Sequence, residues 1–347
     1  MTAVIKTLRY RVKDSTSGKR LKVAADAVTT CWNHCNAMQC HALKHNQRWV
    51  NPRMLQASTK GAGKELGIPS QTVQAVCERY FERRYFRRKP KLRWRGRKSP
   101  GWVPFKNQTI KIEGASVVFN GHRIRLWLHR EIVGRILSGT FSQDSRGRWY
   151  CNLVVECEAK PHKVTESVGI DLGLKVLATL STGERVENPR IFYAAEQRIA
   201  ASQRANKNRL MRARRAKAKN TRRDFLHKES TKIADRFGCI MVGDVSASWQ
   251  RSINGKAVTD ASWGMLRRLL RYKAIARGAV YMDVPEAYTT QVCSSCGVMP
   301  EGRPKGIADL RIRQWECVGC GASHDRDVNA AINIARAGLR TLAEGAL

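Results

Sequence analysis

The sequence predicts a mixed fold in two parts, an N-terminal β domain with a helical insert and a C-terminal α/β domain interrupted by a metal-binding ribbon. Three observations lead to this prediction: strand-like alternation at both ends of a long helical segment, an apolar strand that contains one carboxylate, and two CxxC motifs. With 347 residues, the chain is long enough for two or three domains with cores of their own.

The N-terminal part begins with a strand. Residues 3–12 alternate apolar and polar side chains, which is the period of a half-buried strand. From about Lys19 to Arg88 the apolar residues recur at offsets of three and four, which predicts helices. Residues 101–160 return to alternation, with turn signals such as Asn120-Gly121 between the runs. We therefore expect an antiparallel sheet or barrel that includes the first strand and encloses a helical insert.

The charge of the chain indicates a polyanionic partner. Lys and Arg number 64 against 28 Asp and Glu, for a formal net charge of +36. An excess of this size is the electrostatic footprint of a nucleic-acid-binding protein, although basic proteins of ribosomal type and proteins of acidic membrane surfaces share it. No run approaches the ~18 apolar residues of a membrane span, and no secretory signal begins the chain. We expect a cytoplasmic, nucleoid-associated protein that does not act at membranes.

Two basic tracts are candidate nucleic-acid contacts. Residues 83–98 carry ten basic residues in sixteen, with aromatic residues interleaved, which suits phosphate contact and base stacking. Residues 204–223 carry ten basic residues in twenty and are Ala-rich, as in an exposed helix that follows a phosphate backbone. A solvated linker and an ordinary solvated helix are the alternatives. The candidate residues are Arg83, Arg84, Arg87, Arg88, Lys89, Lys91, Arg93, Trp94, Arg95, Arg212, Arg215 and Lys219.

Four cysteines near the C-terminus have the spacing of a structural zinc site. Cys293 and Cys296 form one CxxC motif and Cys317 and Cys320 a second, and each is followed by a glycine that suits a tight turn. Four thiolates complete a tetrahedral site and leave no position for a reacting water, so one Zn²⁺ is expected to be structural. A redox pair or unmetallated thiols are the alternatives. The other seven cysteines are expected to be reduced thiols.

Carboxylates on either side of these cysteines are candidate ligands of a divalent cation. Asp171 lies in the apolar run 168–172, where a buried acid is costly unless it binds a positive charge. Asp325 and Asp327 open an Ala-rich helix, and one of them is expected to cap it.

Four motifs together resemble the TnpB family of insertion-sequence proteins, relatives of the type V CRISPR effectors. They are GIDLGLKVLATLSTG, VGDVSASW, YTTQVCSSCG and CGASHDRDVNAAINIARAG, in that order over residues 168–338. The resemblance implies an RNase H-like (RuvC) nuclease domain in residues 164–290 and 323–347, with a zinc ribbon in 291–322. It also implies a β-barrel-like wedge domain in 1–18 and 96–163 around a helical recognition domain in 19–95.

The resemblance further implies an RNA-guided DNA endonuclease. A guide RNA derived from the transposon end would pair with double-stranded target DNA beside a short flanking motif, and two Mg²⁺ ions would serve phosphodiester hydrolysis. Asp171 matches the first catalytic acid of the family and Asp327 the last, which makes Asp325 the turn or capping residue. A nuclease-dead RNA-guided repressor and a DNA strand-transfer transposase are the alternatives.

The middle acid departs from the family pattern. Gly243 stands where the family usually has Glu at the end of a strand. Glu286, at the end of another expected strand, is the first candidate for a relocated acid, as in a subset of the family. Asp244 is the second, although a shift of one residue in a strand turns a side chain to the opposite face. Loss of the nuclease activity is the third interpretation.

Overall fold

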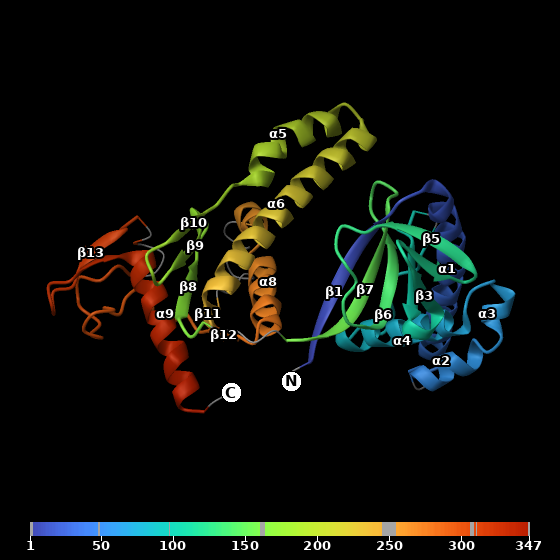
Figure 1. The fold of residues 1–347 in the computed structure, drawn as a ribbon, viewed down its shortest axis with the longest axis horizontal. Helices are drawn as coiled ribbons and strands as arrows, with labels where there is room; N and C mark the ends of the chain where they lie inside the picture. Colours follow the sequence, from blue (N-terminus) through green and yellow to red (C-terminus); the bar gives the residue numbers. More distant parts are fainter. Residues whose placement is uncertain are drawn as a thin grey trace. The chain divides into compact units, whose positions relative to one another are not determined.

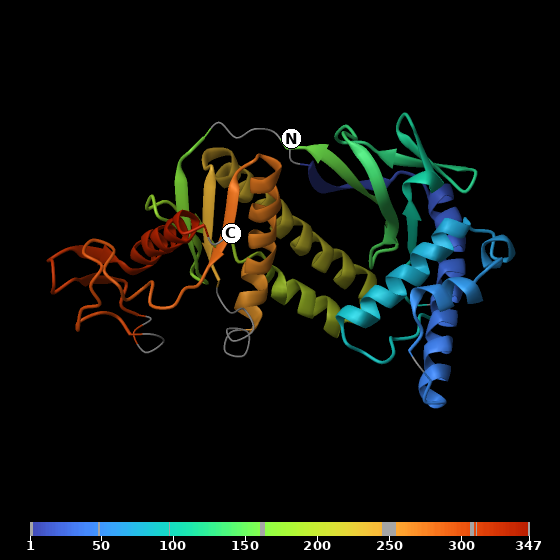
Figure 2. The same cartoon turned by 90° about the horizontal axis from the view of Figure 1, so that it is seen from below.

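The computed structural model describes residues 3–47, 49–96, 98–159, 164–244, 255–305, 309 and 311–345. The chain divides into two compact units, Ile5–Cys157 and Met1–Val4 with Glu158–Leu347, and each is described separately. Figures 1 and 2 show the elements of both units from two directions. Among the helices of the described ranges, none is long and apolar enough to cross a membrane.

The first unit is built on a seven-stranded sheet in the order β2-β6-β7-β1-β5-β4-β3. The alternation predicted a strand at the start of the chain, and this strand, β1, lies in the middle of the sheet. Its core contains the rings of Phe105, Phe119 and Phe141, whose centroids lie 5.0 to 6.3 Å apart. The strands are β1 (Ala3–Val12), β2 (Trp102–Lys106), β3 (Ile110–Glu113), β4 (Ser116–Phe119), β5 (His122–Trp127), β6 (Arg135–Gln143) and β7 (Trp149–Glu158), with a 3-10 turn η1 at Asn107–Thr109.

The helices of this unit lie in the sequence between β1 and β2, where the periodicity predicted them. They are α1 (Ser15–Lys44), α2 (Pro52–Ser58), α3 (Ala62–Glu65) and α4 (Ser70–Phe86). The first helix begins before the expected Lys19 because the side chain of Asp14 accepts a hydrogen bond from the Ser17 N–H, which caps it. The rings of Trp32 and Tyr80 join α1 to α4 edge to face at 5.2 Å.

The second unit is built on a five-stranded mixed sheet in the order β10-β9-β8-β11-β12. The strands are β8 (Ser167–Leu172), β9 (Val176–Leu180), β10 (Arg185–Glu187), β11 (Cys239–Gly243) and β12 (Val280–Val284). β8, β11 and β12 run parallel, whereas β9 and β10 are antiparallel to their neighbours. The carboxyl ends of the three parallel strands therefore lie at one edge of the sheet.

Helices cover both faces of this sheet, with α9 on one face and α6 and α8 on the other (Figures 1 and 2). The helices are α5 (Ile191–Arg204), α6 (Asn208–Arg236), α8 (Trp263–Ala276) and α9 (Arg326–Ala343). A two-stranded sheet of β13 (Gln314–Glu316) and β14 (Ser323–Asp325) precedes α9.

Candidate active site and nucleic-acid interface

The candidate acids lie at the shared carboxyl edge of β8, β11 and β12. Ile170 pairs with Val242, and Gly243 pairs with Val284, so the three parallel strands end in register. Asp171 follows Ile170 in β8 and therefore lies beside Gly243 of β11. This edge of a parallel arrangement is where ligand sites commonly form.

Asp171 and Gly243 face helix α9. A β-carbon at Gly169 would lie 2.0 Å from a backbone oxygen of α9, so this face of β8 packs directly on the helix. Asp171 is two residues further and therefore points to the same side. In β11, the side chain of Met241 packs against Gly338 of α9, and Gly243 is again two residues further.

The side chain of Glu286 fills the space that a side chain at position 243 would need. A β-carbon at Gly243 would lie 1.9 Å from Oε1 of Glu286 and 2.7 Å from its Cδ. Glu286 comes two residues after the end of β12, and its Oε1 is buried with no hydrogen-bond donor among the described residues. An unpaired buried carboxylate oxygen is unfavourable in an apo protein and is a natural ligand for a hard cation.

Burial and mutual repulsion perturb two of these acids. Burial, with a smaller contribution from the nearby Asp327, raises the pKa of Asp171 to about 7, although Arg326 and Arg313 oppose the shift. Burial raises the pKa of Glu286 to about 8, to which Asp171 also contributes. Near neutral pH both carboxyls therefore hold a proton part of the time, and a divalent cation would compete with that proton.

The two acids at the start of α9 have different contacts. Asp325 caps the helix, because its Oδ1 accepts hydrogen bonds from the N–H groups of Asp327 and Val328, as predicted for one of the pair. Asp327 is in the first turn and makes an ion pair with Arg313, whose Nη1 lies 3.0 Å from Oδ1. Arg313 immediately precedes β13, so the ribbon region contacts the candidate acid directly.

Asp244 points away from this group. Its Oδ1 lies 2.7 Å from Nη1 of Arg267, which is on α8 at the opposite face, and its side chain is 56% exposed. Arg267 also pairs with Asp283 at 2.7 Å. A side chain one residue after position 243 was expected to point to the opposite face of the sheet, and the side chain of Asp244 does so. Residues 245–249 of the VGDVSASW motif lie outside the described residues.

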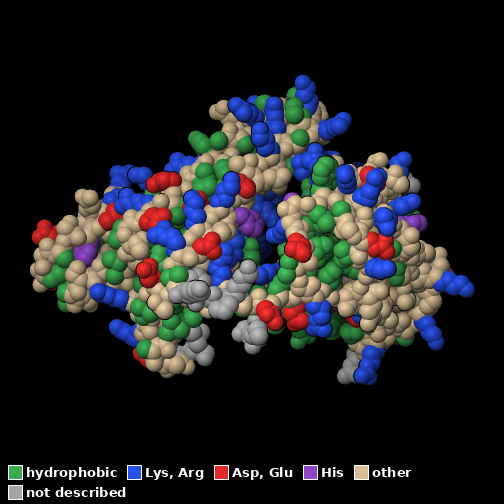
Figure 3. All heavy atoms as spheres, viewed as in Figure 1, with side chains coloured by type: hydrophobic (Ala, Val, Ile, Leu, Met, Phe, Trp, Pro, Cys, Tyr) green, Lys and Arg blue, Asp and Glu red, His purple; other side chains and the backbone are tan. Residues whose placement is uncertain are grey.

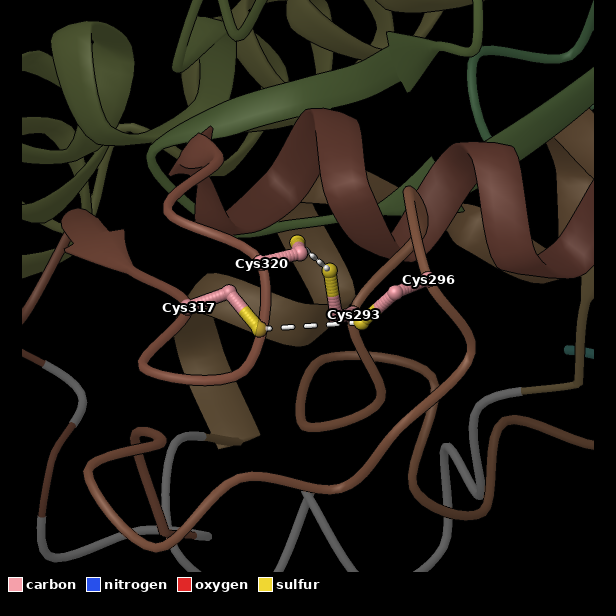
Figure 4. Close-up of side chains that lie close together, drawn as sticks. All are labelled: Cys293, Cys296, Cys317 and Cys320. Atoms are coloured by element: carbon pink, nitrogen blue, oxygen red, sulfur yellow. Dashed lines mark hydrogen bonds between the residues drawn. The ribbon is translucent and has the colours of Figure 1, made fainter.

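The four candidate zinc ligands converge. Their sulfur atoms all lie within 4.8 Å of one another, and a metal such as zinc could be held between them (Figure 4). Cys293 and Cys317 are buried, whereas Cys296 and Cys320 are exposed. Among the described residues no other group of three or more His, Cys, Asp or Glu ligand atoms is this close, so the three candidate carboxylates stand further apart.

Backbone freedom and nearby side chains support the thiolate cluster. The glycines after the two motifs, Gly297 and Gly321, have φ of 77° and 70°, a backbone conformation that favours glycine. His324 was missed by the sequence analysis because it belongs to no CxxC motif, yet its Nε2 lies 3.0 Å from Sγ of Cys293. Among the sequence signals, only its place four residues after Cys320 could have indicated it.

Asparagines of α9 connect the ribbon to the end of β12. Asn329 accepts a hydrogen bond from the Ser294 N–H and donates to the carbonyl oxygens of Thr289 and Val292. Asn333 donates to the same two oxygens. The segment between Glu286 and the first cysteine motif is thereby fixed against α9.

The first basic tract lines a groove of about 620 Å³ in the N-terminal unit. Its backbone is held by side chains of α1: Trp32 Nε1 donates to the Arg93 carbonyl, and Asn33 makes two hydrogen bonds with the backbone of Arg95. The tract is therefore anchored to α1 at Arg93 and Arg95. The lining residues are Trp32, Arg83, Arg87, Lys89, Lys91, Leu92, Arg93, Trp94, Arg95 and Ser99.

The cations of this groove are not balanced by acids. None of its arginines and lysines makes an ion pair among the described residues. Arg83 lies over the rings of Trp32 and Trp102, at 5.8 and 5.9 Å, and burial lowers its pKa. Trp94 is 57% exposed at the groove. The groove is suited to an anionic ligand with flat groups.

Arg84 is a correction to the candidate set. Its side chain is only 2% exposed, its Nη2 donates to the Val50 carbonyl, and its guanidinium lies over the rings of Trp49 and Phe81. Because every fourth residue of α4 returns to the same face, the basic run necessarily turns one arginine into the core. Arg88, which is exposed with φ of 48°, follows the C-cap residue of α4 and does not line the groove.

The second basic tract lies on α6, which forms a helical hairpin with α5. Arg212, Arg215 and Lys219 are exposed, whereas Ala218 is buried against the hairpin. Lys and Arg side chains gather on this hairpin at the top of the view in Figure 3. One face of α6 thus packs and the other presents positive charge.

Comparisons with known proteins agree with this arrangement. Residues 151–251 match the family described as "Probable transposase" (OrfB_IS605), and residues 263–334 match the "Cas12f1-like, TNB domain" family. The chain also aligns over 93% of its length with a Cas12f1 from a cryo-EM complex with sgRNA and target DNA, at a TM-score of 0.61 and 12% identity, covering 83% of that protein. That likeness concerns the fold.

Two relatives are named as RNA-guided DNA endonucleases. One, from Streptomyces pristinaespiralis, is 37% identical over 225 residues, which are 59% of this chain and 54% of the relative. The other, InsQ of Escherichia coli (strain K12), is 30% identical over 249 residues, 62% of this chain and 60% of the relative. The matched region thus spans little more than half of each relative. Over these stretches the chain is therefore similar to both families and to proteins named as RNA-guided DNA endonucleases.

Proposed function

We propose that this chain is an RNA-guided DNA endonuclease whose catalytic acids are Asp171, Glu286 and Asp327. The names of its relatives support the activity, and the mixed sheet with acids at the carboxyl edge of its parallel strands supports an RNase H-like (RuvC) domain. The proposed domain is formed by residues 164–290 and 323–347. A DNA target would make the protein nucleoid-associated.

One observation carries the catalytic assignment: the Glu286 carboxylate occupies the space over Gly243. In the family pattern a glutamate at that strand end projects beside the first aspartate. Here the glycine leaves the position empty and Glu286 enters it from β12, on the face that also contains Asp171. Glu286 thereby compensates for the glutamate that is missing at position 243, which argues against a nuclease-dead protein.

The donor set fits divalent cations. Carboxylate oxygens are the ligands that Mg²⁺ prefers, and the buried Oε1 of Glu286 has no other partner among the described residues. Two Mg²⁺ ions, when bound, would supply activation of a water and stabilisation of the leaving oxygen. The protein's own contribution is to hold three acids on two strand ends and one helix start, and to neutralise Asp327 with Arg313 until the cations bind.

The four cysteines are proposed to hold one structural Zn²⁺. Four thiolates leave no open coordination position, so the ion would stabilise the ribbon of residues 291–322 without reacting. Through Asn329, this ribbon is joined to α9 and to the segment after Glu286. The zinc is therefore expected to affect the active site only by stabilising the structure of the ribbon.

Guide RNA and target DNA are the proposed partners of the two basic surfaces. The groove of the N-terminal unit and the outer face of α6 present unpaired cations, which would contact phosphates independently of base sequence. The N-terminal unit would then supply the wedge domain, in residues 1–18 and 96–163, and the recognition domain, in 19–95. Base pairing with the guide would select the target beside a short flanking motif.

The decisive experiment is cleavage of a matching DNA plasmid by the full-length protein with its guide RNA and Mg²⁺. Cleavage is expected with the wild type and with Asp244→Ala, and none with Asp171→Ala or Glu286→Ala. Wild-type activity of Asp171→Ala would contradict the assignment. Guide-dependent binding without any cleavage would instead identify a repressor.

A strand-transfer transposase is the second candidate, because one matched family is described as "Probable transposase". It predicts joined DNA ends without RNA. Analysis of the same reactions for joined products, with and without the guide, separates the two functions.

A further inference from the structure

A cavity of about 730 Å³ lies in the C-terminal unit next to the turn that follows β8. Leu174, Phe192 and Tyr193 contribute apolar surface, and Lys175, Arg190 and Lys256 contribute positive charge. We propose that this cavity binds a nucleotide of single-stranded DNA next to the phosphate that is cleaved. The proposal rests on the proposed function, because it takes Asp171 as part of the cleavage site.

The walls of the cavity are tied to one another by hydrogen bonds. Asn188 donates from Nδ2 to the Leu174 carbonyl at 2.8 Å and accepts from the Arg190 N–H at 3.1 Å. Asp260 accepts from the Phe192 N–H at 2.9 Å and so joins a third segment to the start of α5. A site fixed in this way loses little conformational entropy when a ligand binds.

The charge at the cavity favours an anion. Lys256 is paired with Glu196 at 2.7 Å, and the carboxylate of Asp260 is used by the start of α5. Lys175 and Arg190 are exposed and make no ion pair with an acid in the part of the chain that the structure describes. Two cations are thus available for phosphate oxygens.

The apolar surface suits a nucleobase. Tyr193 is 72% exposed, and it lines the cavity together with the half-buried Phe192 and Leu174. A base that stacks on such a ring is held without regard to its identity, which a nuclease directed by a guide requires. The cavity volume is within the range of small-ligand sites.

Other ligands also contain a base and a phosphate, but the position of the cavity favours single-stranded DNA. Leu174 is three residues after Asp171, and three residues span at most about 10 Å. Neighbouring nucleotides of one extended DNA strand can therefore contact the cavity and Asp171 at the same time. The buried indole of Trp263, which donates to the Gly173 carbonyl at 3.0 Å, fixes the turn between the two places.

The test uses the full-length protein carrying Asp171→Ala, without Mg²⁺, and a dT12 oligonucleotide with one 5-iodouracil. Irradiation is expected to crosslink the probe to the peptide that contains Tyr193. The crosslink should be lost with Tyr193→Ala and kept with Trp127→Ala, which removes a comparably exposed ring (53%) elsewhere. Because no cleavage is measured, this result is independent of whether the protein is a nuclease.

A second arm measures cleavage of single-stranded DNA by the protein with its guide. Tyr193→Ala should raise KM at least about fivefold with little change in kcat. Tyr193→Phe should have the KM of the wild type, since stacking needs only the ring. Lys175→Gln with Arg190→Gln should make the affinity for dT12 less dependent on salt. Absence of a crosslink at Tyr193 together with an unchanged KM would overturn the proposal. Binding of dTMP as tight as that of dT12 would also overturn it, in favour of a free-nucleotide site.

Discussion

Oε1 of Glu286 lies 1.9 Å from the point where a β-carbon at Gly243 would be. Gly243 ends β11 and Glu286 follows β12, yet only one of the two positions can have a side chain in this space. This mutual exclusion suggests an exchange experiment. Gly243→Glu alone should lower the unfolding temperature and the activity, because two carboxylates would compete for one buried volume. Gly243→Glu with Glu286→Ala should recover part of the plasmid cleavage that Glu286→Ala loses. Gly243→Ala with Glu286→Ala is the matched control and should stay inactive; equal activity of both double variants would show that the acid is not needed there.

The raised pKa values of Asp171 and Glu286 predict the pH dependence of the apo protein. An acid whose pKa is higher in the folded state than in the unfolded chain binds more protons when folded. The stability of the C-terminal unit should therefore fall as the pH rises from about 4 through 7 to 8. Asp171→Asn and Glu286→Gln should remove part of this dependence and raise the unfolding temperature at pH 8, by about 2–4 °C for each kcal/mol gained. Thermal unfolding without added Mg²⁺ across this pH range measures it, and a profile that rises toward pH 8 would contradict the assignment.

The same two pKa values predict the pH dependence of cleavage. Cations bind to the deprotonated acids, so Mg²⁺-dependent activity should increase between pH 6 and about 8.5. Higher Mg²⁺ concentrations should move the rise to lower pH, because the cation and the proton compete. Rates at several Mg²⁺ concentrations provide the test, and a profile that does not move with Mg²⁺ would exclude the competition.

The thiolate cluster predicts one bound metal ion per chain. Cys317→Ser removes a buried ligand and should release zinc, whereas Cys157→Ser, outside the cluster, should retain it. Loss of the metal should also reduce cleavage, because Asn329 and Asn333 join the ribbon to the segment after Glu286. Zinc content by elemental analysis is the measurement, with cleavage assayed in parallel. Full zinc content in Cys317→Ser would rule out the site.

The basic groove predicts that Trp94 contributes to RNA binding. Trp94→Ala should weaken the affinity for single-stranded RNA by about 1–3 kcal/mol if a base stacks on it. Trp127→Ala, with a similarly exposed ring, is the control. Arg87→Gln with Lys91→Gln should reduce the salt dependence of binding by roughly 0.7 per lost contact. Fluorescence anisotropy across salt concentrations tests both effects, and identical losses for the two tryptophan variants would disprove a specific role of the groove.

Arg84 should behave in the opposite way. Arg84→Ala removes the donor to the buried Val50 carbonyl and the packing on Trp49, so it should destabilise the N-terminal unit by about 1–3 kcal/mol. The RNA affinity of the folded protein should stay close to that of the wild type, unlike that of Arg87→Ala. Urea unfolding and anisotropy on the same samples distinguish the two arginines.

Much of the local structure could be predicted from the sequence, because it depends on short-range periodicity. The alternation in residues 3–12, the helical offsets that follow and the glycines after each CxxC motif all describe neighbours in the chain, and the structure has strands, helices and tight turns there. The capping role of Asp325 was among the predicted possibilities for the same reason. The burial of Arg84 was missed, since charge density says nothing about which side of a helix meets the core.

The sequence by itself determined which residues are available for chemistry: four thiolates at metal-binding spacing, acids within apolar strands, and a large excess of cations. It left Glu286, Asp244 and loss of the acid as alternatives for the middle position. Only the tertiary structure decided how these residues meet, because strand register and helix packing join positions that are far apart in the chain. Gly243 ends β11 and Glu286 comes two residues after β12, so the two positions share one space only because β11 and β12 pair in parallel.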